Sequence, residues 1–189
     1  MEVKWVKVSC IVTVMILCGQ VGAAVTDPWA DSVVSFDRPA GSSGLGGSAT
    51  DALGERDGKT VSVDLPEVLV LAFTNNRAVD GPGDDLYVYG LANSTSMIDV
   101  DASASNGTWT HLGEFSGSAG FDLSDFPGLT SVKFVRFVGM DDAGELPGFE
   151  LDAVQSLNGV CTAVPAPGAV ILGGIGACLV ARLRRRHMF

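Results

Sequence analysis

The sequence predicts an all-β fold, a single jelly-roll or β-sandwich domain between an N-terminal signal peptide and a short C-terminal transmembrane sorting tail. The 189 residues include 24 glycines and only 18% charged residues, which is typical of a loop-rich β protein rather than a helical bundle. Short apolar or alternating segments recur at roughly 8–12-residue spacing with turn residues between them. A sustained helical period is absent from the sequence between the two ends.

The body, residues 25–158, is expected to contain about eight strands. The alternation in Val61–Leu65 indicates a strand with one buried face. The continuous apolar run Val68–Phe73 indicates a central strand. A turn at Asp80–Gly83 introduces the next strand. The other strands are expected at Leu86–Tyr89, Met97–Asp101, Trp109–Phe115, Ala119–Leu123, Val132–Val138 and Phe149–Ser156.

The charge is strongly acidic and unevenly distributed. The formal net charge is -10, but half of the basic residues lie at the two ends. The stretch from Val25 to Val164 holds 21 acidic and six basic residues, a balance of about -15. This charge excludes nucleic acid as a partner, because phosphate binding needs clustered Lys and Arg. It also disfavours docking on an anionic membrane surface.

Residues 1–24 have the layout of a secretory signal peptide. Lys4 and Lys7 precede the apolar run Val8–Leu17, and small residues at 22–24 predict cleavage after Ala24. The alternative is a retained transmembrane anchor, for which the apolar run is short.

The C-terminal end combines a proline motif, an apolar segment and a basic tail. Residues 159–167 form a linker that ends in Pro165, Ala166 and Pro167. The apolar segment 168–181 is shorter than the about 20 residues that a relaxed transmembrane helix needs. The tail 182–189 should stay cytoplasmic by the positive-inside rule, since it carries Arg182, Arg184, Arg185 and Arg186. The alternative is a plain membrane anchor.

Residues Val164–Arg186 resemble the PEP-CTERM sorting signal of Gram-negative bacteria, with Ala166 where the family usually has Glu. The resemblance implies recognition by an exosortase and transient anchoring in the inner membrane. It further implies cleavage near the proline motif and delivery of the mature protein to the cell envelope, cell surface or extracellular matrix.

Acidic residues cluster beside turns in three places. These are Asp51–Gly58, Asp80–Asp85, and Glu150 and Asp152 of the last strand together with Asp141 and Asp142 upstream. A period of two places Glu150 and Asp152 on one face of that strand. With six bases in the whole body, a hard cation with oxygen ligands is the natural counter-charge. The sequence therefore predicts a structural calcium site, with solvated acidic turns as the alternative.

The body also resembles exported bacterial surface proteins with a galactose-binding-like jelly roll. The matching stretches are Asp31–Phe36, Ala52–Gly58, Val79–Tyr89, Gly120–Leu123, Val135–Val138 and Gly148–Val154. The resemblance implies that calcium lies between an Asp-Gly loop and an acid on the last strand. Carried over by position, the ligands are Asp57 with Glu150 or Asp152, and Asp80, Asp84 and Asp85 are further candidates.

For three aromatic residues and one histidine, the sequence allows either a structural or a functional role. Trp109 and one of Tyr87 and Tyr89 are expected to fill the core, with a sugar-stacking platform as the alternative. His111 is expected on a strand surface, because the sequence beside it lacks the partners of a catalytic histidine. Cys161 is the one cysteine of the exported body, so the sequence predicts a fold without an internal disulfide.

Together these features predict an exported protein with a calcium-stabilised β-sandwich and a structural or adhesive role, rather than an enzyme. Extracellular polysaccharide is its expected binding partner. The alternatives are a lectin-like carbohydrate-binding module and a small secreted hydrolase.

Overall fold

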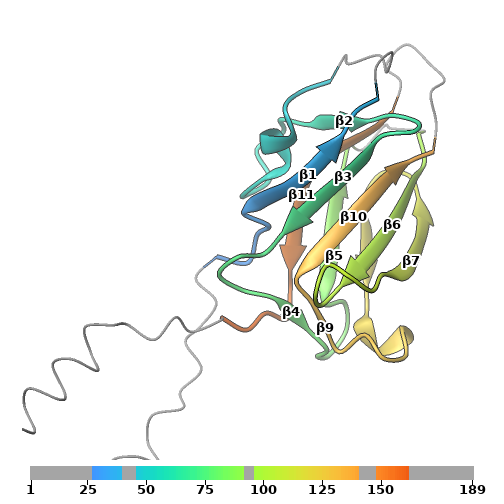
Figure 1. Cartoon of the computed structure of the whole chain (residues 1–189). Helices are drawn as coiled ribbons and strands as arrows, with labels where there is room; N and C mark the ends of the chain where they lie inside the picture. Colours follow the sequence, from blue (N-terminus) through green and yellow to red (C-terminus); the bar gives the residue numbers. More distant parts are fainter. Residues whose placement is uncertain (1–26, 40–45, 92–95, 141–147, 162–189) are drawn as a thin grey trace, which may run out of the picture.

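The computed structural model describes residues 27–39, 46–91, 96–140 and 148–161. In these ranges the chain forms a β-sandwich (Figure 1), with a five-stranded and a four-stranded sheet and a separate two-stranded pair. The described residues include no helix long and apolar enough to cross a bilayer. The predicted signal peptide, proline motif, apolar segment and basic tail lie outside the described residues.

The five-stranded sheet is antiparallel throughout, in the order β1-β3-β10-β6-β7. Its strands are β1 (Ser32–Asp37), β3 (Val68–Ala72), β10 (Phe134–Gly139), β6 (Ile98–Ser103) and β7 (Thr110–Phe115). The register pairs Asp101 of β6 with Arg136 on one side and with His111 on the other. This row of three charged or ionisable residues therefore runs straight across the sheet.

The four-stranded sheet has the order β2-β11-β5-β8. Its strands are β2 (Val61–Val63), β11 (Phe149–Ser156), β5 (Leu86–Gly90) and β8 (Ala119–Phe121). The pairing of β11 with β5 contains a bulge between Leu151 and Ala153. Smaller elements are the pair β4 (Ala78–Val79) and β9 (Ser131–Val132), and the 3-10 turns η1 (Ala49–Ala52) and η2 (Leu123–Asp125).

The core lies between the two large sheets. Alternate residues of each strand point inward, and side chains of both sheets form one cluster. Phe137 of β10 and Phe149 of β11 are fully buried, and burial of a side chain of this size stabilises the fold by about 1.5–3 kcal/mol. The Phe115 ring meets the rings of Phe121 and Phe149 edge-on, at centroid distances of 5.6 and 5.7 Å.

All eight predicted strands are confirmed, although the segment Val132–Val138 divides into β9 and β10. Strand β1 was not predicted, because a bulge between Val33 and Ser35 breaks its alternation. The expectation that Trp109 and one tyrosine fill the core is wrong. Trp109, Tyr87 and Tyr89 are all half-buried and lie outside the core cluster.

Candidate functional site

The outer face of the four-stranded sheet carries three half-buried aromatic residues, Trp29, Tyr87 and Tyr89, which we call the aromatic row. In β5 the aliphatic Leu86 and Val88 are fully buried, so the two tyrosines alternate with them and point outward. The ring centroids of Tyr87 and Tyr89 lie 4.6 Å apart, and those of Tyr89 and Trp29 lie 5.8 Å apart. The three rings therefore lie in a row, with neighbouring ring planes tilted by 47° and 48°.

Trp29 reaches this surface from the far side of β11. It forms an isolated antiparallel bridge with Gln155, and the neighbouring Ala30 N–H donates to the Val154 carbonyl at 2.9 Å. Residues 28–30 thus pair with β11 on the edge opposite β5. The aromatic row crosses β11, where Ala153 pairs with Tyr89 and is fully buried. A small side chain at this position leaves space for the rings above it.

Polar groups border the aromatic row. The Tyr89 hydroxyl donates to Gln155 Oε1 at 2.7 Å. The Arg56 guanidinium lies 5.6 Å from the centroid of the Tyr89 ring, and the Arg56 side chain is 59% exposed. The surface therefore combines flat apolar rings with an amide and a cation at its edge, and these groups can bind hydroxyl oxygens.

Three of the predicted calcium ligands gather beside this surface. Asp152 Oδ1 accepts the backbone N–H groups of Asp57 and Gly58 at 3.2 and 3.3 Å, and Arg56 Nε lies 3.5 Å from Asp152 Oδ2. Glu150 Oε2 accepts the Thr60 hydroxyl. The predicted proximity of the Asp57 loop to Asp152 and Glu150 is thus present, and protein donors bind both strand carboxylates.

The Asp57 carboxylate itself turns away toward a lysine. Lys59 Nζ lies 2.6 Å from Asp57 Oδ2, and the Lys59 backbone N–H donates to Asp57 Oδ1 at 2.9 Å. The hydrogen bonds from Lys59 lower the pKa of Asp57 from its ordinary value. Asp57 contacts Asp152 through its backbone amide.

The other predicted ligands lie near the opposite end of β11, where Leu86 pairs with Ser156. Asp85 is fully buried, and its carboxylate accepts Leu123 N–H at 2.9 Å and Asn158 Nδ2 at 2.7 Å. Carboxylate oxygens of Asp80, Asp85 and Asp122 lie within 4.8 Å of one another. Asp84 is not a member of this group.

Sequence reasoning missed Asp122, which precedes η2 and caps it by accepting the Ser124 backbone N–H at 2.9 Å. Hydrogen bonds from Ser124 lower the pKa of Asp122. The signal that could have identified it is the Asp-x-Ser capping pattern. Five of the six predicted ligands thus lie in two separate groups, Asp84 belongs to neither, and calcium binding stays a prediction.

No family model matches the chain, and no curated protein matches it. Among solved structures, the C-terminal domain of a chitobiase from Bacteroides fragilis is 14% identical, with a TM-score of 0.47 over 75% of this chain and 99% of that one. The CBM32 of AlyQ, in complex with 4,5-unsaturated mannuronic acid, is 13% identical, with a TM-score of 0.40 over 71% and 98%. Chitosan-binding module 1 of a chitosanase/glucanase from Paenibacillus sp. IK-5 is 15% identical, with a TM-score of 0.43 over 74% and 97%. At these identities and TM-scores, the matches assign neither a family nor a ligand to this chain.

Proposed function

We propose that this domain binds carbohydrate through the aromatic row. The observation that supports the proposal is the row of three neighbouring rings, Trp29, Tyr89 and Tyr87, with Gln155 and Arg56 at its edge. A pyranose ring has an apolar C–H face and a rim of hydroxyl groups. Aromatic rings offer a matching flat apolar face, and polar side chains beside them fix the orientation of the hydroxyls.

The charge of the body narrows the class of polysaccharide. A balance of about -15 between Val25 and Val164 repels polyanions over several ångströms. The expected ligand is therefore a neutral or amine-bearing polysaccharide rather than a polymer of uronic acids or sulfated sugars.

The carboxylates that a hydrolase would use are bound by protein donors. Asp152 accepts two backbone amides and faces Arg56, and Glu150 accepts the Thr60 hydroxyl. A retaining or inverting glycosidase needs one carboxylic acid and one free carboxylate at the scissile bond. These contacts favour binding without turnover.

The binding experiment uses an array of neutral, amine-bearing and acidic glycans, followed by calorimetry on the strongest hit. Trp29→Ala should weaken binding at least about tenfold, which corresponds to about 1.4 kcal/mol. Trp109→Ala is the matched control, because Trp109 is also half-buried but stacks against Arg136 beside the other sheet. Equal affinity of the Trp29→Ala variant and the unmodified protein, or absence of any glycan hit, would refute the proposal.

The proposal also includes export and processing. Residues 1–24 would direct secretion, and an exosortase would remove the segment after the Pro165–Pro167 motif, leaving the domain at the cell surface or in the extracellular matrix. There it would act as a structural or adhesive component. Mass spectrometry of the surface-exposed protein tests this step: a C-terminus near Pro167 supports it, and a product that still ends at Phe189 contradicts it.

A further inference from the structure

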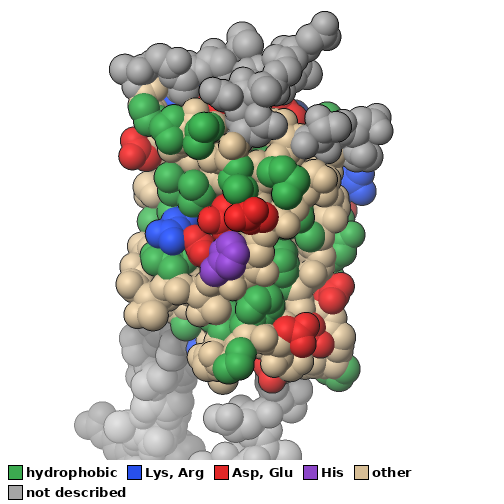
Figure 2. Space-filling view, turned by 90° about the vertical axis from the view of Figure 1, so that its right-hand side faces the viewer, with side chains coloured by type: hydrophobic (Ala, Val, Ile, Leu, Met, Phe, Trp, Pro, Cys, Tyr) green, Lys and Arg blue, Asp and Glu red, His purple; other side chains and the backbone are tan. Residues whose placement is uncertain are grey.

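The outer face of the five-stranded sheet carries two aspartates and a histidine that face one another. Asp99 and Asp101 are alternate residues of β6 and therefore share a face. His111 of β7 pairs directly with Asp101. We call these three residues the Asp–His cluster. It belongs to a different sheet from the aromatic row, and Figure 2 shows the histidine on this face among acidic and basic side chains.

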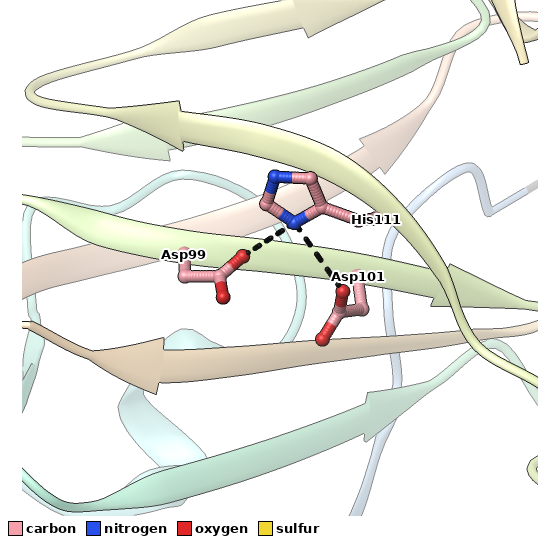
Figure 3. Close-up of side chains that lie close together, drawn as sticks. All are labelled: Asp99, Asp101 and His111. Atoms are coloured by element: carbon pink, nitrogen blue, oxygen red, sulfur yellow. Dashed lines mark ion pairs between the residues drawn. The ribbon is translucent and has the colours of Figure 1, made fainter.

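One ring nitrogen of His111 faces both carboxylates. Nδ1 lies 2.9 Å from Asp99 Oδ1 and 3.6 Å from Asp101 Oδ1, as Figure 3 shows. The second ring nitrogen points away from both. One ligand atom from each residue lies within 4.8 Å of the other two. Since the three residues lie on paired strands rather than on loops, the sheet register holds this arrangement in place.

The Asp99 carboxylate oxygen in this cluster lacks a hydrogen-bond donor. Asp99 Oδ1 is hidden from solvent and accepts no hydrogen bond, although Nδ1 of His111 is only 2.9 Å away. The N–H direction of the ring therefore does not point at this oxygen. An ion on the axis of the Nδ1 lone pair would have this oxygen to one side, where it could serve as a second ligand.

Arg136 orients one of the carboxylates without occupying the cluster. Its Nε and Nη2 donate to Asp101 Oδ2 at 2.9 and 2.6 Å, which leaves Asp101 Oδ1 directed at His111. The guanidinium is itself fixed over the Trp109 ring, 4.7 Å from the centroid. Glu114 pairs with Asp99 in the register and adds a third carboxylate nearby. One cation against three carboxylates leaves negative charge at the cluster.

We propose that Asp99, Asp101 and His111 bind a divalent transition-metal ion of the zinc class. An imidazole nitrogen with two carboxylate oxygens is a donor set for such ions, whereas calcium selects oxygen ligands. At ligand distances of about 2.0–2.1 Å, two ligands of a tetrahedral zinc ion lie about 3.3 Å apart. The separations of 2.9 and 3.6 Å lie on either side of this value. Three protein ligands leave one position for water or a further ligand.

The test is a calorimetric titration of the full-length chain with Zn²⁺, in a background in which Cys10, Cys18, Cys161 and Cys178 are replaced by Ser and His187 by Ala, so that no other cysteine or histidine competes. One equivalent should bind, and Asp99→Asn or His111→Ala should weaken binding by at least about tenfold. Glu114→Gln is the matched control: it removes the same charge from the residue paired with Asp99 and should leave the affinity within about threefold. Circular dichroism with a chelator checks that each variant folds.

A measurement on the unsubstituted chain does not depend on any variant. In a ¹⁵N NMR spectrum of the histidine side chains, Zn²⁺ should shift Nδ1 of His111 much more than its Nε2. The proposal is overturned if Zn²⁺ leaves the His111 signals unchanged. It is also overturned if Glu114→Gln weakens binding as much as Asp99→Asn, since the attraction would then be a general property of the acidic face.

Discussion

The pair of Arg38 and Glu67 connects the two sheets and should dominate the stability of this end of the sandwich. Glu67 is fully buried in the turn between β2 and β3, and Arg38 follows β1. Arg38 Nε lies 2.7 Å from Glu67 Oε1, while Glu67 Oε2 accepts the Asp64 N–H at 3.2 Å. Arg38 Nη2 also donates to the Ser62 carbonyl at 3.2 Å. The Arg38→Met substitution therefore leaves a buried carboxylate without its cation.

Removal of one partner of a buried ion pair costs about 3–5 kcal/mol. The Arg38 side chain is 28% exposed, so water can reach part of the vacated space and we expect the lower value, about 3 kcal/mol. With a urea m-value of about 1.5 kcal/mol/M for a domain of this size, the unfolding midpoint should fall by about 2 M.

The double variant Arg38→Met with Glu67→Gln supplies the matched control, because it removes the cation and the carboxylate charge together. Its midpoint should recover at least half of the loss, as expected when no charge is left buried and unpaired. Urea unfolding followed by tryptophan fluorescence measures both midpoints. A shift below about 0.4 M for Arg38→Met, or a double variant no more stable than the single one, would refute this reasoning.

Three further predictions follow from contacts near the acidic groups and the aromatic row. Tyr89→Phe removes the hydrogen bond to Gln155 and should lower the free energy of unfolding by about 1 kcal/mol, measured by urea unfolding; an unchanged midpoint would contradict it. Lys59→Met should raise the pKa of Asp57, because the hydrogen bonds from Lys59 lower it. The stability that this pKa shift contributes is present above the unfolded-state pKa of Asp57 and is lost as pH falls through the lowered folded-state pKa. An NMR titration that finds no rise in the pKa of Asp57 would contradict the contact between Lys59 and Asp57. Millimolar calcium should raise the thermal midpoint of unfolding, because an ion that binds only the folded domain stabilises it; a midpoint that calcium does not move would contradict the predicted calcium site.

Alternation predicts the strands of this fold well where pairing is regular. Phe134–Gly139 pairs regularly with both of its neighbours, its residues alternate between half-buried and buried, and it lies largely within the predicted strand Val132–Val138. In β1 the bulge at Val33 and Ser35 shifts the inward positions, so its side chains do not follow one period. A bulge depends on how the strand pairs with its neighbour, so the local sequence pattern does not predict it.

Only part of the aromatic row could be predicted from the sequence. Tyr87 and Tyr89 share a face because they are two residues apart, and the aliphatic Leu86 and Val88, which alternate with them, favour placing that face outside. Trp29 comes from a distant segment that reaches the row only because it pairs with β11. Local sequence gives no information on such a pairing. For Asp122 the Asp-x-Ser pattern indicates a capping residue, but its position beside Asp80 and Asp85 depends on the tertiary fold.

Chemical-shift mapping of the ¹⁵N-labelled protein with the strongest glycan from the array tests the central claim most directly. The account predicts that the largest changes fall on the backbone amides of Trp29, Tyr87 and Tyr89 and on the side-chain amide of Gln155, all on the outer face of the four-stranded sheet. Largest changes on β6 and β7 instead, with the aromatic row unaffected, would contradict it.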